Sequence, residues 1–256
     1  MAVRLDELAV PVIGAPMAGG ASTPELAAAV NRAGGLGFLA AGYKSATGMA
    51  EQIAAVRKST DRPYGVNLFV PAPPADPAAV AAYRERLRPE AERWGVALPE
   101  EIGPDRDDWE AKLAVLLADP VPVVSYTFGL PTAEESAALR AGAVAVQLGT
   151  ALLRSDESGA SAAHRAALTE LPETVVTRAF TGRPARGLRN AFIDRHGPYA
   201  PPAYPEVHHL TAPLRAAATR RADTDAMHLW AGTAHRLART GPAEDIVAQL
   251  WRSARG

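Results

Sequence analysis

Residues 11–43 read PVIGAPMAGGASTPELAAAVNRAGGLGFLAAGY, and this stretch predicts a strand, a helix and a second strand in succession. The apolar run at 11–18 predicts the first strand. Thr23 supplies a capping hydroxyl and Pro24 stands at an early helical position, so we expect a helix to begin here and to end at the following glycine pair. Residues 36–41 predict the second strand. Because this alternation is typical of parallel sheets covered by helices, the sequence predicts an α/β fold.

The strand and helix signals continue beyond this stretch. Residues 64–70 (YGVNLFV) predict a third buried strand, and residues 121–127 (VPVVSYT) predict a fourth. A fifth strand is expected at 143–148, with helices at 47–58 and 132–141. Five such strands suit either an open doubly wound sheet or part of a barrel, and the pattern alone does not choose between them.

Two parts of the chain depart from the regular alternation. Charged helical patterns at 76–94 and 105–118 predict a helical insertion (72–119) over one end of the sheet. The segment 182–209 is rich in Pro, Gly, Arg and Tyr, and we expect it to be irregular. The other elements expected are a short strand at 175–179 and terminal helices at 213–222 and 243–253.

The composition is that of a soluble globular protein. The 256 residues suffice for one large domain or two small ones, with 48% apolar and 21% charged residues. A net charge of -1 gives no global attraction to nucleic acid, and no apolar run approaches the roughly 20 residues of a membrane span. The absence of cysteine excludes thiolate chemistry and fits a reducing, cytoplasmic compartment. Asp6 and Glu7 argue against a signal peptide.

The first candidate binding segment is Ala15, Pro16 and Met17, at the carboxyl end of the first expected strand. Ligands sit at that end of the strands in α/β folds. Small residues let a flat ring approach the backbone, and Met17 offers a soft apolar surface. The alternative is a tight strand–helix turn that needs glycine for its geometry alone.

The second candidate is Asn67, the one polar side chain that is conspicuous in the third strand. A buried amide left unpaired costs about 1–3 kcal/mol, so Asn67 needs partners. Its carboxamide is both donor and acceptor, which matches the edge of a pyrimidine-like ring. The alternative is an amide satisfied by neighbouring backbone.

The third candidate is the segment Gln147, Leu148, Gly149 and Thr150, at the end of the fifth strand. Gly149 permits close backbone approach, and Thr150 adds a hydroxyl at the start of a helical turn. Backbone N–H groups there favour phosphate, and barrel enzymes often bind phosphate after their last two strands.

Other polar residues form weaker patterns. The histidines, His208, His209 and His228 among them, show no metal-ligand spacing, so we expect no metal. Three arginines recur at a spacing of three on a Gly/Pro-rich loop and form either a phosphate clamp or solvated charge: Arg183, Arg186 and Arg189. GxGxxG, GxSxG and P-loop motifs are absent from the sequence.

Taken in order, several segments resemble the nitronate monooxygenase family, formerly called 2-nitropropane dioxygenases. The matching segments are PVIGAPMAGG with TPELAAAVNRAGGLGFLAAGY (11–43), GVNLF (65–69), VVSYTFGLP (123–131), AGAVAVQLGTALL (141–153), RAFTGRPARGLRN (178–190) and HLWAGTAHR (228–236). They span most of the chain, so the specificity comes from the series rather than from one motif.

The resemblance implies a TIM-type (β/α) barrel that binds FMN without a covalent bond. It places the backbone of Ala15, Pro16 and Met17 against the flavin ring, a hydrogen bond from Asn67 to the flavin, and the phosphate end at Gln147–Thr150. The implied reaction is oxidation of an alkyl nitronate by O2 to a carbonyl compound and nitrite, with a histidine as the base toward nitroalkanes. With this fold, we expect the chain to divide into an FMN-binding barrel portion (1–180) and a C-terminal segment (181–256).

Against the family pattern the chain lacks the middle of its barrel, with a join near 128–132. Only five of eight strands are recognisable, and eight strand–helix units need about 200 residues or more. The missing block, on the order of 80 residues at roughly 30 residues per unit, would carry the Gly-Gly-His turn of the catalytic histidine and half of the phosphate site. No histidine of this chain can be assigned as catalytic.

The gap raises structural and functional alternatives. Five strands cannot close an eight-strand barrel, so we expect the fourth strand to lie beside the fifth, in the place of the missing seventh. Open edges would need a cover or would pair with another chain, which allows a homo-oligomer. An FMN-dependent enoyl-reductase-like enzyme and a catalytically inactive deletion product stand beside the nitronate monooxygenase interpretation.

Overall fold

The computed structural model describes residues 3–72, 75–103, 105–128 and 146–255. The chain forms two compact units. The first unit consists of Met1–Pro71, Arg106–Ala160 and Leu237–Gly256. The second consists of Ala72–Asp105 and Ser161–Arg236. Both units are therefore built from segments that are distant in the sequence.

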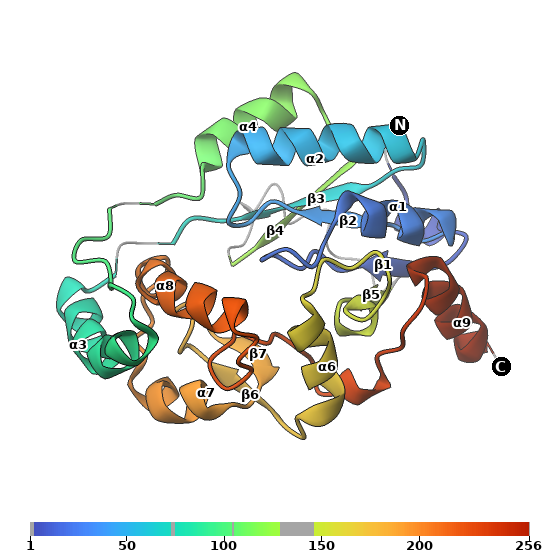
Figure 1. The fold of residues 1–256 in the computed structure, drawn as a ribbon. Helices are drawn as coiled ribbons and strands as arrows, with labels where there is room; N and C mark the ends of the chain where they lie inside the picture. Colours follow the sequence, from blue (N-terminus) through green and yellow to red (C-terminus); the bar gives the residue numbers. More distant parts are fainter. Residues whose placement is uncertain (1–2, 73–74, 104, 129–145, 256) are drawn as a thin grey trace. The chain divides into compact units, whose positions relative to one another are not determined.

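The first unit contains parallel strands in the order β5-β1-β2-β3-β4 (Figure 1). Their bounds are β1 Val12–Gly14, β2 Phe38–Ala40, β3 Gly65–Phe69, β4 Val123–Thr127 and β5 Val146–Leu148. β1 pairs with β5, and β2, β3 and β4 form a second ladder. A parallel bridge between Ile13 and Leu36 connects the two ladders, because Gly14 N donates to Leu36 O over 2.9 Å. The prediction of an α/β fold with a parallel sheet is confirmed.

Two helices of the first unit, α1 and α2, begin at residues whose side chains cap them. Its helical elements are η1 Leu5–Glu7, α1 Pro24–Arg32, α2 Ala46–Ser59, α4 Trp109–Ala118, η3 Thr150–Leu152 and α9 Ala243–Arg255. The Thr23 hydroxyl accepts from the Leu26 N–H over 3.0 Å, as the capping pattern predicts. The Ser45 hydroxyl caps α2 in the same way through the Gly48 N–H.

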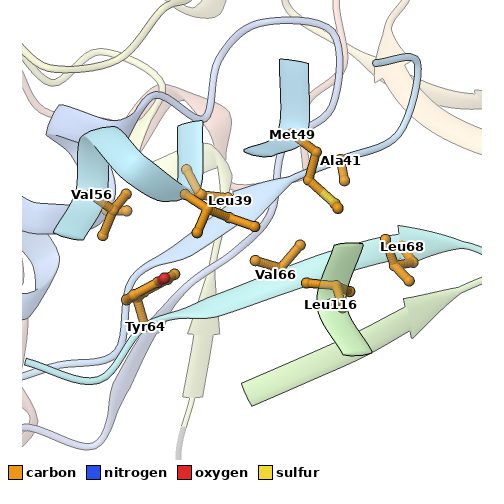
Figure 2. Close-up of a cluster of buried hydrophobic side chains, with 10 residues drawn as sticks. Leu39, Ala41, Met49, Val56, Tyr64, Val66, Leu68 and Leu116 are labelled. Atoms are coloured by element: carbon orange, nitrogen blue, oxygen red, sulfur yellow. The ribbon is translucent and has the colours of Figure 1, made fainter. Parts of the chain in front are cut away.

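One face of β2 and β3 carries the core of this unit. Leu39, Val66 and Leu68 pack against α2 and α4 in a buried cluster that includes Met49 and Leu116 (Figure 2). Successive side chains of a strand point to opposite faces of the sheet. Ala40 and Asn67, the strand residues between these core positions, therefore face away from the helices.

A second cluster joins the chain's two ends. Val12 of β1 and Val30 of α1 pack with Ile246 and Val247 of α9, and Arg32 pairs with Glu244 over 3.2 Å. The C-terminal helix therefore completes the cover over the N-terminal strand and belongs to the first unit.

The second unit is mainly helical. Its elements are α3 Pro77–Trp94, α6 Ala162–Glu170, β6 Thr174–Thr177, β7 Ala185–Leu188, α7 Ala191–His196, η4 Gly197–Tyr199, α8 Glu206–Arg220 and, at its end, η5 His235–Leu237. β6 and β7 are antiparallel. The buried carboxylate of Glu90 accepts from the Trp94 indole over 3.0 Å and from Arg195 over 3.1 Å, which ties α3 to α7.

Several expectations need correction. The segment 182–209 is not irregular, because it contains β7, α7 and the start of α8, and α8 begins seven residues before the expected position 213. Helix α6 was not expected at all. The helical insertion divides: α3 belongs to the second unit, and α4 packs beside α2 in the first. The helix expected at 132–141 lies outside the described residues.

The expected pairing of the fourth strand with the fifth is wrong for the described residues. β4 pairs with β3 and β5 pairs with β1, so these strands stand at opposite edges of the described sheet. The helix-facing core under β2 and β3 is complete without closure, and this explains how the sheet is held without that pairing.

The close approach of α1 to β2 depends on Gly37. A Cβ at this position would lie 2.1 Å from the Ala27 carbonyl oxygen, and backbone cannot move aside at small cost. We predict that Gly37→Ala lowers the free energy of unfolding by about 1–3 kcal/mol, as overpacking typically does. Gly48→Ala is the control, because the nearest atom to its Cβ, Ser45 Oγ, lies 3.4 Å away. Urea denaturation tests this, and equal stability of the two variants would contradict it.

Candidate functional site

The carboxyl ends of β1 and β5 bring two predicted segments together. The register pairs Gly14 with Leu148, and the Ala15 N–H donates to the Leu148 carbonyl over 2.8 Å. A Cβ on Gly149 would lie 3.3 Å from Ala15 Cβ and 3.6 Å from Met17 Sδ. The segment 15–17 and the segment 147–150 therefore lie against each other, although more than 100 residues separate them in the sequence.

A buried serine fixes the turn after β1. Ser22 is 2% exposed, and its hydroxyl accepts from the Met17 N–H over 2.8 Å and donates to the Ala15 carbonyl over 3.3 Å. Its own N–H donates to the Met17 carbonyl over 3.2 Å. Ala15, Pro16 and Met17 remain half-buried, so they form a rigid backbone segment that is accessible on one side. The role of Ser22 was not predicted from the sequence.

The segment after β5 makes a sharp turn. Gly149 precedes the single 3-10 turn η3, and the Leu152 N–H donates to the Gly149 carbonyl over 2.9 Å. Leu152 is buried and anchors the turn, whereas Gln147 is exposed and Thr150 is half-buried. Polar groups of this segment are thus available beside Ala15 and Met17.

Asn67 lies on β3 and is 3% exposed. Its amide nitrogen donates to Ser125 Oγ over 2.9 Å and to Thr127 Oγ1 over 3.0 Å, and Thr127 Oγ1 donates to its oxygen over 3.2 Å. The partners are hydroxyls of β4 rather than the backbone that the alternative interpretation invoked. A carboxamide oxygen has two lone pairs, so it keeps capacity for a second donor.

Ser125 and Thr127 are the further polar residues of this region that sequence reasoning missed. They alternate with apolar residues in VVSYT, and this period of two places both hydroxyls on one face of β4. The signal was present in the sequence and could have been paired with Asn67. The structure thus joins 15–17 with 147–150, and holds Asn67 on β3, two strands along the same sheet.

The arginine series does not form a clamp. Arg183 is buried with its guanidinium 3.7 Å from the centre of the Tyr204 ring, while Arg189 pairs with Asp194 and Glu173. Arg186 donates to Thr174. Because each arginine has separate contacts, the phosphate-clamp interpretation gains no support.

All six histidines of the chain lie in the second unit. His208 and His228 are held neutral: burial, aided by the Arg215 charge, lowers the pKa of His208 to about 2 and that of His228 to about 3. Burial also lowers the pKa of His164, whose Nε2 lies 3.1 Å from the Trp230 carbonyl oxygen. Over the described ranges, no group of three or more potential ligands could hold a metal ion. Within that same part of the chain, no helix could cross a bilayer.

Comparison with known proteins identifies a family along nearly the whole chain. The family model described as nitronate monooxygenase matches residues 3–136 and again 134–253. A "Probable nitronate monooxygenase" of Staphylococcus saprophyticus is 29% identical, over 95% of this chain and 94% of the relative. A protein of the same description from Staphylococcus aureus is 28% identical, over 94% of this chain and 93% of the relative.

Two solved structures are also similar to this chain. A nitroalkane oxidase from Streptomyces ansochromogenes is 40% identical, with a TM-score of 0.89 over 98% of this chain and 99% of that chain. FabK from Thermotoga maritima is 22% identical, with a TM-score of 0.58 over 99% of this chain and 97% of that chain, and this likeness concerns the fold alone.

The comparisons also bear on the predicted gap. The alignment with the Staphylococcus saprophyticus protein extends over 335 positions, whereas this chain has 256 residues, so at least 79 positions have no counterpart here. The two segments matched by the family model meet at 134–136, a few residues after the expected join at 128–132. The Staphylococcus saprophyticus protein therefore has at least 79 aligned positions that this chain lacks, and the break between the two matched segments falls near the expected join.

The neutral buried histidines make stability depend on pH. The pKa of His228 is about 3 in the folded protein against 6.5 in the unfolded chain, so below pH 6.5 only the unfolded chain takes up this proton. Its stabilising contribution is complete above pH 6.5 and decreases as the pH falls toward 3. We predict that between pH 7 and pH 5 wild type loses about 2 kcal/mol through this group alone.

His228→Phe removes this contribution, so the variant should lose about 2 kcal/mol less than wild type over the same interval. Leu229→Ala, at the neighbouring buried position, is the control, because neither side chain titrates and the variant should keep the wild-type pH profile. Denaturant titrations at pH 7 and pH 5 measure the difference. An identical loss in His228→Phe and wild type would refute this account.

Proposed function

Because the chain belongs to the nitronate monooxygenase family, we propose that it binds FMN and oxidises alkyl nitronates with O2, releasing a carbonyl compound and nitrite. The observation that carries the proposal is the contact of the Ala15–Met17 turn with Gly149 at the carboxyl ends of β1 and β5. Ligands of parallel α/β sheets bind at this end of the strands. When bound, FMN supplies the electron transfer between the nitronate and O2.

The half-buried turn after β1 fits one side of a flat ring. Ser22 holds the Met17 N–H and the Ala15 carbonyl, so the backbone from Ala15 through Pro16 to Met17 presents a fixed surface. A fixed surface loses little conformational entropy when a ring stacks on it. We assign the flavin ring to this turn.

Asn67 suits the pyrimidine edge of the flavin. Ser125 and Thr127 occupy both protons of its amide nitrogen and so fix the orientation of the carboxamide. The remaining lone pair of the Asn67 oxygen can accept from the flavin ring N–H. The two hydroxyls on β4 therefore act through Asn67.

The segment Gln147–Thr150 suits the phosphate end. Gly149 has no side chain between the backbone and the Ala15–Met17 turn, so an anion can approach its N–H closely. Thr150 adds a hydroxyl, and exposed Gln147 can reach the same anion from the side. These donors can bind some of the phosphate oxygens. This agrees with the resemblance, which assigns the other half of the phosphate site to the missing block.

The substrate we propose is the nitronate anion rather than the neutral nitroalkane. A neutral nitroalkane must first lose a carbon-bound proton to a base. The first unit, which carries every proposed FMN contact, contains no histidine. A preformed nitronate needs no such base, so this chemistry remains accessible to the chain.

We further propose that the five parallel strands are the remainder of an eight-stranded barrel. The strand order β5-β1-β2-β3-β4 is that of consecutive barrel strands with a gap between the fourth and the last. At least 79 aligned positions without counterpart suffice for the missing strands. The likeness to FabK concerns the fold and does not favour enoyl reduction.

The proposed function predicts a yellow protein that uses nitronates. Wild type incubated with FMN and passed through a desalting column should retain flavin absorbance. It should consume O2 and release nitrite with ethyl nitronate, and act at most one tenth as fast on nitroethane, because the unit that carries the proposed FMN contacts has no histidine base. A colourless protein would refute FMN binding, and oxidation of NADH with an enoyl substrate would favour the reductase alternative.

Removal of the Asn67 carboxamide should weaken FMN binding. We predict that Asn67→Leu, which is nearly isosteric, raises the Kd for FMN about tenfold, the effect of one lost hydrogen bond in a buried site. Ser125→Ala is the matched control, because it removes one Asn67 partner and leaves the carboxamide in place. Quenching of FMN fluorescence measures both, and equal Kd values for Asn67→Leu and wild type would remove Asn67 from the site.

A further inference from the structure

A lysine amine lies at the carboxyl end of β2, the edge of the parallel sheet at which the proposed flavin segments also lie. Lys44 follows β2, and its Nζ donates to the Ala40 carbonyl over 2.9 Å. The next residue, Ala41, donates its N–H to the Asn67 carbonyl, toward β3. The Ala40 carbonyl and the Ala41 N–H belong to one trans peptide group and point in opposite directions, so the Ala40 carbonyl points toward β1. The amine therefore lies on the side of β2 that faces the strand leading into Ala15–Met17.

The loop that carries Lys44 is fixed by a buried ion pair. Lys112 is 0% exposed, and its Nζ lies 2.8 Å from Asp107 Oδ2. The other oxygen of Asp107 accepts from the Tyr43 N–H over 2.8 Å, and Asp108 accepts from the Ala46 N–H over 3.1 Å. The carboxylates of Asp107 and Asp108 thus bind backbone N–H groups before and after Lys44, and these hydrogen bonds hold the loop.

The Lys44 ammonium keeps donors for a ligand. Within the described part of the chain its hydrogen-bond partner is the Ala40 carbonyl, which uses one of three protons. Burial, with the nearby Lys112 charge, lowers the pKa of Lys44, while Asp107 raises it. A partly desolvated ammonium interacts more strongly with an anion than a solvated one, because less water screens the pair.

Three aromatic rings stand at the carboxyl ends of neighbouring strands, the same edge of the sheet as this amine. Tyr43 follows β2, Phe69 ends β3 and Phe128 follows β4. The Tyr43 and Phe69 ring centres are 5.2 Å apart, and those of Phe69 and Phe128 are 4.8 Å apart. Tyr43 is 37% exposed and Phe128 is 45% exposed, so the group presents an apolar surface.

We propose that Lys44 binds the negatively charged oxygens of the nitronate substrate, while the Tyr43–Phe69–Phe128 group contacts its alkyl chain. The inference rests on the proposed function and specifies the substrate site within it. A nitronate carries its charge on two oxygens at one end of an apolar chain, which matches one ammonium beside an aromatic surface. Lys44 is a positioning residue, because it orients the anion and takes no part in the electron transfer.

The test compares three variants by calorimetric titration with ethyl nitronate, with and without FMN. Lys44→Met removes the charge and keeps the length of the side chain. Lys44→Arg keeps the charge, and Lys58→Met removes one exposed charge from α2 as the matched control. We expect Lys44→Met to raise the Kd for ethyl nitronate at least tenfold, and Lys44→Arg and Lys58→Met to stay within threefold of wild type.

A purely structural role gives a different pattern. Nitroethane, the neutral comparator, should bind wild type and Lys44→Met equally, and the Kd for FMN should be the same in both. Unchanged nitronate affinity in Lys44→Met, or no nitronate binding by wild type, would overturn the proposal. Loss of FMN affinity in Lys44→Met would assign the amine to the flavin and overturn it as well.

These outcomes remain distinct from failure of the proposed function. Wild type that binds no FMN contradicts the flavin assignment, yet the titration without FMN still measures the effect of Lys44 on the anion. Wild type that binds FMN but shows no difference between Lys44→Met and Lys58→Met leaves the flavin assignment intact and removes Lys44 from the substrate site.

Discussion

The pairing of β1 with β5 is the constraint on which the candidate site depends. Three pairs of residues are in register between these strands, and the last pair is Gly14 with Leu148. This register brings the carboxyl ends of β1 and β5 together. In a parallel pair both strands reach the same edge of the sheet, so the turns that follow them must meet. The contact of Gly149 with Ala15 and Met17 is a direct consequence. A shift of the register by one residue would turn every side chain of β5 to the other face and separate these groups.

The sequence alone was sufficient for the elements with strong local signals. The Thr23 cap, the helical pattern at 47–58 and the apolar strand at 64–70 predicted α1, α2 and β3 to within a few residues. The same signals failed in 182–209, where Pro and Gly suggested an irregular chain. There, tertiary contacts hold β7 and α7: the Arg189 N–H donates to the Glu173 carbonyl, and the Asn190 amide donates to the Thr224 and Met227 carbonyls. Contacts between distant segments carry no signature in a local window.

For the candidate site, the sequence indicated the segments but not the residues that contact them. The three segments were found because small residues or a polar residue interrupt apolar strands, and such interruptions are local. The partners of those residues were not found, because Ser125 approaches Asn67 only through the β3–β4 register. The expected pairing of the fourth strand with the fifth failed for a related reason. It assumed that an open sheet must close, whereas the two buried clusters on the helix side of the sheet hold it together without closure.

The proposed loss of barrel strands affects flavin binding and proton abstraction to different degrees. Under the proposed function, the groups assigned to the flavin lie on or just after β1, β3 and β5, whereas the family resemblance assigns the base to the absent block. Removing a base raises the barrier only for a step in which a proton must be transferred, so a substrate that arrives as an anion is affected least. Such a substrate needs a cation more than it needs a base. Lys44 provides that cation at the carboxyl end of β2, and the buried Lys112–Asp107 pair fixes the loop that carries it. Under this proposal, the placement of Lys44 favours an anionic substrate over its neutral acid.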